Sequence, residues 1–195
     1  MKKMMNGWRP SDEACFPPFM KGTLMKDVVL LYDDCCIYEI VILNYFLKVT
    51  GSDLVFCSLD EKAIKVTEGY SILPDAALKN IDLSEIRSFI IPGGDISHID
   101  QDIVYDSLKS LHNTNVLIAG ICAGVDVLEK AGLLDGIRSS HMEEYDCVLD
   151  KNILTARANA YVDFAIEAAK ALDIFEDEAD LQETIAFWKE FKRAL

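Results

Sequence analysis

The sequence predicts an α/β fold in which a mainly parallel β-sheet is covered by helices on both faces. Three observations predict it. Short, fully apolar runs of strand length recur along the chain, as strands buried on both faces require. Segments with helical periodicity separate these runs. Glycine or proline closes several of the segments, so strands and helices alternate as they do in βαβ units.

The first half of the chain is expected to hold two strands, a helix and a hairpin. The runs at 28–32 and 54–57 are apolar, and the segment at about 36–49 between them repeats its apolar residues with helical spacing. Gly51 suits the end of this helix because glycine accepts the left-handed backbone found there. At 63–73, a turn signal between two β-prone stretches predicts the hairpin.

The second half of the chain repeats the strand and helix alternation three times. Apolar runs that predict strands lie at 89–91, 116–119 and 153–155. Helical patterns follow them at 102–112, 123–131 and 161–172. In a parallel sheet, reactive groups gather at the C-terminal ends of the strands. The loops that follow these strands are therefore where the sequence predicts chemistry.

The alternating elements form one domain with a shorter segment on each side. The chain has 195 residues, 51% of them hydrophobic, which is enough to bury a single core without disulfides. The domain is expected to span 25–172, and residues 1–24 are expected to be a poorly ordered N-terminal extension. Residues 173–195 show an apolar stripe that predicts an amphipathic helix, packed on the domain or at a dimer contact.

Charge and cysteine usage exclude several classes of partner and compartment. With 33 acidic against 19 basic residues, the net charge of −14 repels nucleic-acid phosphates and anionic membrane surfaces. No apolar run approaches the roughly 20 residues of a membrane helix, and residues 1–26 lack the apolar stretch of a signal peptide. The six cysteines are therefore expected to be reduced, in the cytoplasm.

The segment 117–130 carries the strongest signal of chemistry. It places Gly120-Ile-Cys122-Ala-Gly124 between an apolar strand and a helix, the pattern of a nucleophile elbow with sulfur as the nucleophile. The small residues allow the tight turn that exposes Cys122, and the positive end of the following helix is expected to lower the pKa of its thiol. The other cysteines singled out lack this context and are expected to pack inertly: Cys35, Cys57 and Cys147.

Two further groups are expected near Cys122. Pro92-Gly93-Gly94 ends the strand at 89–91, and its N–H groups can join that of Ala123 in holding an oxyanion if the two strands are neighbours. Glu39 follows the first strand in an apolar neighbourhood, which raises the pKa of a carboxyl and lets it hold and donate a proton. From its spacing alone, Glu39 fits a solvated surface position at least as well.

The chain resembles the ThiJ/PfpI superfamily and, within it, the branch of the Parkinson-disease-associated protein deglycase. The matching stretches are 28–39, 71–78, 90–95, 120–124 with 128–136, and 153–157. This resemblance implies a flavodoxin-like three-layer sandwich that is usually dimeric. It also implies that Cys122 is the nucleophile, Glu39 its protonated partner, and Gly94 and Ala123 the backbone donors to an oxyanion.

One departure from the family pattern concerns histidine. Ala123 follows the cysteine where the peptidase-like branch has a histidine, so a built-in Cys-His dyad is absent. His141 occupies the place where the deglycase branch carries a histidine near the cysteine, which makes it a candidate base. The alternative for His141 is an ordinary surface position.

The adjacent residues Cys35 and Cys36 are a second departure, beside Glu39. They could resolve an oxidised Cys122 or simply pack. Metal binding by these cysteines with a histidine is disfavoured, because the chain has no Cys-x-x-Cys pair. Neither a metal nor a cofactor is therefore expected.

Three functions are consistent with this site. The resemblance implies a glyoxalase-like or deglycase-like lyase or hydrolase, in which Cys122 attacks a small reactive carbonyl compound such as methylglyoxal and Glu39 moves the proton. The alternative is a stress-response role as a redox sensor or chaperone that uses reversible oxidation of Cys122. A cysteine peptidase or amidase comes third, weakened by the missing histidine. A homodimer is expected in each case.

Overall fold

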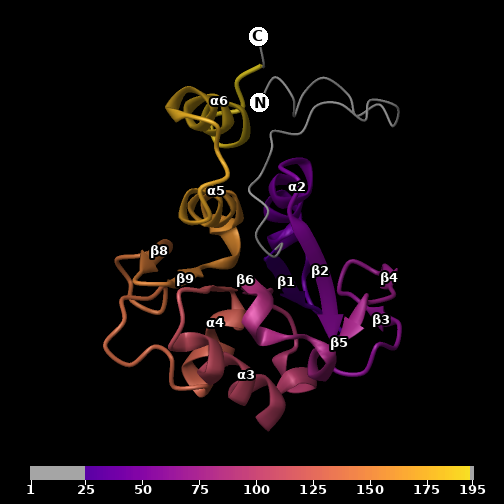
Figure 1. Ribbon diagram of the computed structural model, residues 1–195. Coiled ribbons are helices and arrows are strands. Elements are labelled where there is room, and N and C mark those ends of the chain that lie inside the picture. The colour runs from indigo at the N-terminus through magenta and orange to yellow at the C-terminus, as the bar shows by residue number, and fades with distance from the viewer. Residues whose placement is uncertain (1–24, 194–195) are drawn as a thin grey trace.

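In the computed structural model, which describes residues 25–193, seven strands form one sheet in the order β5-β2-β1-β6-β7-β9-β8 (Figure 1). The strands are β1 (Lys26–Leu30), β2 (Asp53–Ser58), β5 (Ala76–Ala77), β6 (Ile86–Ile91), β7 (Leu117–Ile121), β8 (Cys147–Asp150) and β9 (Ile153–Ala156). All neighbours pair in parallel except β8 and β9, which are antiparallel at one edge. The expected N-terminal extension, residues 1–24, lies outside the described residues.

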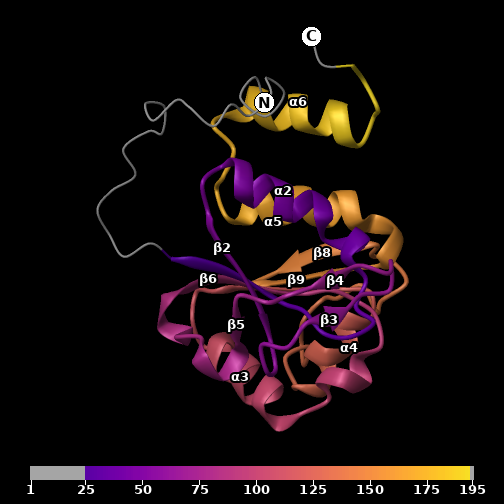
Figure 2. The ribbon, with the colours of Figure 1, turned by 90° about the vertical axis from the view of Figure 1, so that its right-hand side faces the viewer.

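Helices cover both faces of this sheet. The α-helices are α2 (Val41–Val49), α3 (Asp102–His112), α4 (Ala123–Lys130), α5 (Tyr161–Ala171) and α6 (Glu178–Trp188). Short 3-10 turns lie at Ile37–Glu39, Leu78–Asn80, Leu83–Glu85, Ile96–Ile99 and Ala158–Ala160. Helices α2 and α5 lie on one face, and α3 and α4 on the other (Figure 2). This confirms the predicted flavodoxin-like three-layer sandwich. None of the helices within 25–193 is both long and apolar enough to span a membrane.

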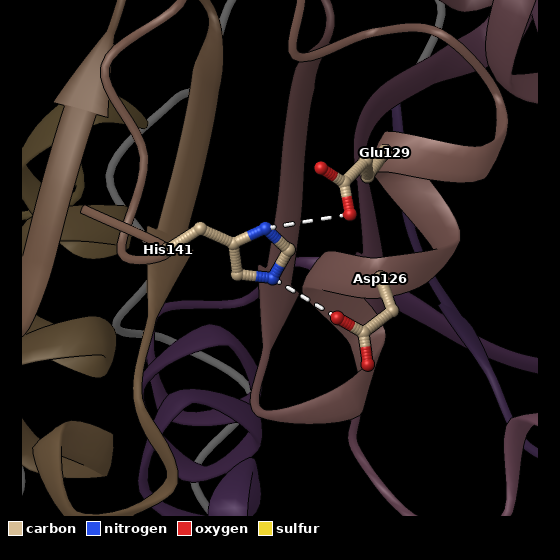
Figure 3. Close-up of side chains that lie close together, drawn as sticks. All are labelled: Asp126, Glu129 and His141. Atoms are coloured by element: carbon tan, nitrogen blue, oxygen red, sulfur yellow. Dashed lines mark ion pairs between the residues drawn. The ribbon is translucent and has the colours of Figure 1, made fainter.

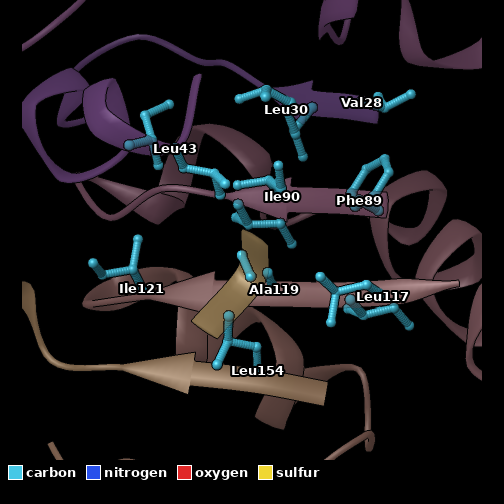
Figure 4. Packing of buried hydrophobic residues seen from close by; sticks show 14 of the residues in the cluster. Val28, Leu30, Leu43, Phe89, Ile90, Leu117, Ala119, Ile121 and Leu154 are labelled. Atoms are coloured by element: carbon cyan, nitrogen blue, oxygen red, sulfur yellow. The ribbon is translucent and has the colours of Figure 1, made fainter. Parts of the chain in front are cut away.

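The apolar runs of the sequence form the centre of the sheet. The strand register aligns Val29, Ile90, Ala119 and Leu154 side by side across β1, β6, β7 and β9. All four side chains are fully buried, and Figure 4 shows Ile90, Ala119 and Leu154 among the packed residues of the core. Burial of a Val, Ile or Leu side chain stabilises the fold by about 1.5–3 kcal/mol. The runs are apolar throughout because both faces of the sheet are covered.

The predicted hairpin is present, and several element boundaries differ from expectation. Strands β3 (Ile64–Lys65) and β4 (Ser71–Ile72) pair antiparallel within the predicted 63–73 segment. The helix expected at 36–49 begins instead as the 3-10 turn, and α2 starts only after Ile40, whose φ of −120° departs from helical geometry. Strands β5 and β8 were not predicted.

The C-terminal segment contributes α6, which is shorter than the amphipathic helix expected within 173–195. Figure 2 shows α6 lying over the layer of α2 and α5. The Trp188 ring packs against the rings of Tyr45 and Phe46 on α2, with both centroid distances at 5.9 Å. These tilted and edge-to-face ring contacts hold α6 against its own domain.

Candidate active site around Cys122

Cys122 lies on a sharp turn between β7 and α4, where two glycines make the turn possible. Its backbone has φ 55° and ψ −127°, a conformation that costs a non-glycine residue about 1–3 kcal/mol. A Cβ on Gly120 would lie 2.9 Å from the Gly124 carbonyl oxygen, and one on Gly124 would lie 2.3 Å from that of Ile91. The spacing Gly-x-Cys-x-Gly therefore follows from close backbone packing, and it holds the cysteine at the strand's end.

Glu39 reaches the same place from a different element. It ends the 3-10 turn that follows β1, and only 2% of the residue is exposed. Its Oε2 accepts a 2.6 Å hydrogen bond from the backbone N–H of Gly93. A Cβ on Gly93 would lie 2.7 Å from this oxygen and 3.0 Å from the Cys122 sulfur. The Glu39 carboxyl and the Cys122 sulfur thus both lie against Gly93, whose lack of a side chain leaves space for them.

The pKa values of the two groups are both raised, and the causes are connected. Burial raises the pKa of Cys122 to about 11, helped by the charge of Glu39 and opposed by the N–H of Ala123. The expectation of a lowered thiol pKa was wrong, because burial and the facing carboxylate outweigh the helix terminus. Burial also raises the pKa of Glu39, against the N–H of Gly93 and a hydrogen bond with Cys122. Each group therefore holds its proton to a higher pH than it does in water, and the Cys122 thiol keeps its proton at neutral pH.

The loop Pro92-Gly93-Gly94 follows β6, which lies next to β7 as the oxyanion expectation required. It is fixed against the segment after β1: Cys36 N–H donates to the Gly93 carbonyl at 2.8 Å, and Cys35 forms an isolated bridge with Gly94. Gly94 has φ 131°, and a Cβ there would lie 2.3 Å from the Asp34 carbonyl oxygen. Only glycine fits at this position.

His141 does not join this group. Its Nε2 lies 3.0 Å from Oδ1 of Asp126, and its Nδ1 lies 3.6 Å from Oε2 of Glu129 (Figure 3). Both carboxylates belong to α4, so both ring nitrogens face that helix. Within residues 25–193 no hydrogen bond joins His141 to Cys122.

The remaining cysteines of the described region differ in exposure. Burial raises the pKa of three of them to about 12 each, as inert packing predicts: Cys35, Cys57 and Cys147. Cys36 is partly exposed at the rim of the site, with its sulfur 3.7 Å from the hydroxyl of Thr67.

Sequence reasoning missed Glu68, a second carboxylate at the rim. Its Oε1 accepts a 2.7 Å hydrogen bond from the N–H of Tyr38, the residue before Glu39. The hairpin that carries Glu68 is tied to the same segment, since Thr67 N–H donates to the Cys35 carbonyl at 3.0 Å. The turn at 67–69 was visible in the sequence, but nothing there indicated that it would close over Cys35 and Tyr38.

Comparisons with known proteins agree with this architecture. The model of the DJ-1/PfpI family matches residues 25–171. Protein dj-1beta of Drosophila melanogaster is 27% identical over 154 residues, covering 69% of this chain and 82% of its own. The glutathione-independent glyoxalase DJR-1.2 of Caenorhabditis elegans is 28% identical over 109 residues, covering 55% of this chain and 59% of its own. The crystal structure of a thiJ/pfpI family protein from Bacillus anthracis superposes with a TM-score of 0.79, at 22% identity, covering 88% of this chain and 94% of that one.

Proposed function

This chain belongs to the DJ-1/PfpI family, and from that premise we propose that it is a cofactor-free enzyme that acts on small reactive carbonyl compounds through Cys122. The family includes the relative named as a glutathione-independent glyoxalase, which supports an enzymatic role of this kind. The observation that carries the proposal is the contact of Glu39 and Cys122 across Gly93, with the carboxyl fixed by the 2.6 Å bond to the Gly93 N–H.

The proton of the Cys122 thiol takes part in the first step of the reaction. When Cys122 passes its proton to Glu39, the sulfur becomes a thiolate and the carboxyl becomes an acid. The thiolate adds to the aldehyde carbon of a substrate such as methylglyoxal, and the carbonyl oxygen becomes an oxyanion. The N–H groups of Ala123 and Gly94 are the proposed donors to that oxygen, which takes its proton from Glu39.

The later steps use the same carboxyl. Glu39, now a carboxylate, removes the proton from the carbon bound to sulfur and returns it to the neighbouring carbon, while the hydroxyl proton passes from the oxygen on the first carbon to the oxygen on the second. The product of this transfer is a thioester of an α-hydroxy acid on Cys122. Water cleaves the thioester, restores the thiol and releases the hydroxy acid, so the sum of the reaction is addition of one water to the dicarbonyl.

The test is conversion of methylglyoxal to D-lactate by the purified protein in the absence of glutathione. We expect product with the wild type and none with Cys122→Ser, while Cys36→Ser, which alters the other partly exposed thiol at the rim, keeps most of the activity. Absence of D-lactate from protein whose Cys122 is fully reduced would reject the proposal.

A redox-sensing or chaperone role is the second candidate, favoured by one further observation. Cys122 is partly exposed and faces a carboxyl that could donate to an oxidised sulfur, and Cys36 lies on the same rim as a possible resolving thiol. Intact-mass measurement after mild peroxide treatment tests it. Two added oxygens confined to Cys122, or loss of two hydrogens in a disulfide with Cys36, would support this role, and an unmodified Cys122 would reject it.

The peptidase or amidase interpretation has less support. Ala123 follows the cysteine, and both ring nitrogens of His141 face carboxylates of α4. A His141→Ala variant with unchanged hydrolysis would exclude this histidine as the base. The homodimer, the cytoplasmic location and the stress-response role stay predictions.

A further inference from the structure

Asp126, Glu129 and His141 form a cluster of potential metal ligands outside the cysteine site (Figure 3). One ligand atom of each residue lies within 4.8 Å of the other two. Among residues 25–193, this is the only group of three or more histidine, cysteine or acidic side chains that meets this limit. The cluster brings an imidazole from a loop onto two carboxylates from one helix.

The segment that carries His141 is fixed to the sheet. The N–H of Ser140 donates to the buried hydroxyl of Thr155 on β9 at 2.9 Å. The N–H of Met142 donates to the Ser139 carbonyl at 3.0 Å, which closes a turn around His141. Asp126 and Glu129 are three residues apart on α4, so they project from the same side of the helix. The backbone thus holds the His141 ring between the two carboxylates, one at each ring nitrogen.

The donor set determines which ligand fits. One imidazole nitrogen and two carboxylates suit a divalent transition-metal ion, with positions left open for water. Ligand atoms around a tetrahedral zinc ion lie about 3.4 Å apart. The 3.0 Å between His141 Nε2 and Asp126 is already close to this, so Glu129 has to make most of the adjustment. Its side chain is 65% exposed and has three rotatable bonds to do so.

Ion pairing of a protonated His141 with both carboxylates is the competing account of the cluster. Exposed pairs of this kind contribute little, and here the imidazole is 36% exposed and Asp126 is 50% exposed. The chain carries a net charge of −14, which attracts cations to such a cluster. A metal ion therefore has both the access and the electrostatic attraction to replace the proton on one ring nitrogen.

We propose that Asp126, Glu129 and His141 bind a divalent transition-metal ion between α4 and the loop that carries His141. The site lies along the helix that starts directly after Cys122, and Asp126 is one helical turn from that residue. A bound ion holds His141 on α4 and neutralises two negative charges on this helix. The inference does not depend on the proposed carbonyl chemistry.

Cobalt(II) is the probe that separates this site from the cysteines. Ligation by nitrogen and oxygen gives only weak visible absorption, whereas a thiolate ligand adds strong charge-transfer absorption in the near ultraviolet. We expect the reduced protein to bind one equivalent of Co²⁺ with the weak spectrum alone, and Zn²⁺ to compete for it in calorimetric titration. Removal of any ligand, in Asp126→Asn, Glu129→Gln or His141→Ala, should weaken binding at least tenfold.

His98 provides the matched control, because its Nε2 also faces two carboxylates, at 3.5 Å from Asp34 and 4.0 Å from Asp95. The His98→Ala variant should bind Co²⁺ as the wild type does. The inference is overturned if the wild type binds no ion, if His141→Ala binds as tightly as the wild type, or if binding shows thiolate absorption that disappears in Cys122→Ser. Circular dichroism of each variant establishes that it is folded.

Discussion

Glu39 Oε2 accepts a hydrogen bond from the N–H of Gly93 at 2.6 Å, and the Cα of Gly93 faces the sulfur of Cys122. Burial disfavours the charged form of the Glu39 carboxyl, and this hydrogen bond partly offsets that effect while it holds the carboxyl in place. The proton that the thiol must lose therefore has a nearby acceptor of raised basicity. The close packing at Gly93, which follows β6, thus places the proton acceptor beside Cys122, which follows the neighbouring strand β7.

Replacement of Glu39 by glutamine should separate the charge of the carboxyl from its shape. The amide keeps an oxygen for the Gly93 N–H but cannot carry charge or exchange a proton. We expect the pKa of Cys122, measured as the pH dependence of its alkylation rate, to fall below about 11 because a facing negative charge is gone. Turnover of methylglyoxal should nevertheless fall by about a hundredfold. A rise of the thiol pKa would show instead that the resting proton sits on Glu39.

For the same variant we expect a change in the free energy of unfolding that depends on pH. The folded protein holds the Glu39 proton to higher pH than the unfolded chain, whose carboxyl titrates near 4.5. The stabilisation that this proton gives is complete below that value and is lost as pH rises through the folded pKa. Urea unfolding should therefore find Glu39→Gln more stable than the wild type at pH 7, with the difference shrinking toward pH 4. Equal differences at both pH values would contradict this.

The bounds of the strands could be predicted only in part, because polar residues begin some of them. The apolar run at 89–91 predicted the end of β6, whereas Arg87 and Ser88 hid its beginning. Both pair with Asp27, which is fully buried: Ser88 donates to its Oδ1 at 2.7 Å and Arg87 forms an ion pair with it. Such a network depends on the parallel pairing of β1 with β6, which no local pattern of the sequence contains.

Gly93→Ala should damage the site more than the fold. The new methyl carbon would lie 2.7 Å from both the Cys122 Cβ and Glu39 Oε2, so the carboxyl must move away from the sulfur. We expect turnover to fall at least tenfold, with a modest loss in the urea midpoint. Gly136→Ala is the control, because a Cβ there meets nothing within 4 Å and only the φ of 69° opposes it. That variant should lose about 1 kcal/mol of stability and keep its turnover.

The candidate site was predictable where local sequence determines the backbone and unpredictable where tertiary contacts do. The elbow at Cys122 follows from the spacing of two glycines between a strand and a helix. Glu39 was assigned from a family resemblance, since its spacing also fits a surface residue. The carboxylates that face His141 were not predicted at all, because their meeting depends on the path of the loop over α4. The 67–69 turn was predicted, but not its closure over Tyr38.

The backbone of Cys122 predicts that the nucleophile is held at a cost in stability. Its φ of 55° and ψ of −127° are strained for any residue with a Cβ, and glycine removes most of that strain. Cys122→Gly should therefore be more stable than Cys122→Ala by about 1 kcal/mol, after allowance for the greater flexibility of glycine in the unfolded chain. Lys109, exposed within α3, is the matched position, where glycine should instead be about 1 kcal/mol less stable than alanine. Thermal and urea unfolding of the four variants test this. If alanine is the more stable at both positions, the turn at Cys122 is not strained, and the sharp bend has to be attributed to the packing of Gly120 and Gly124 alone.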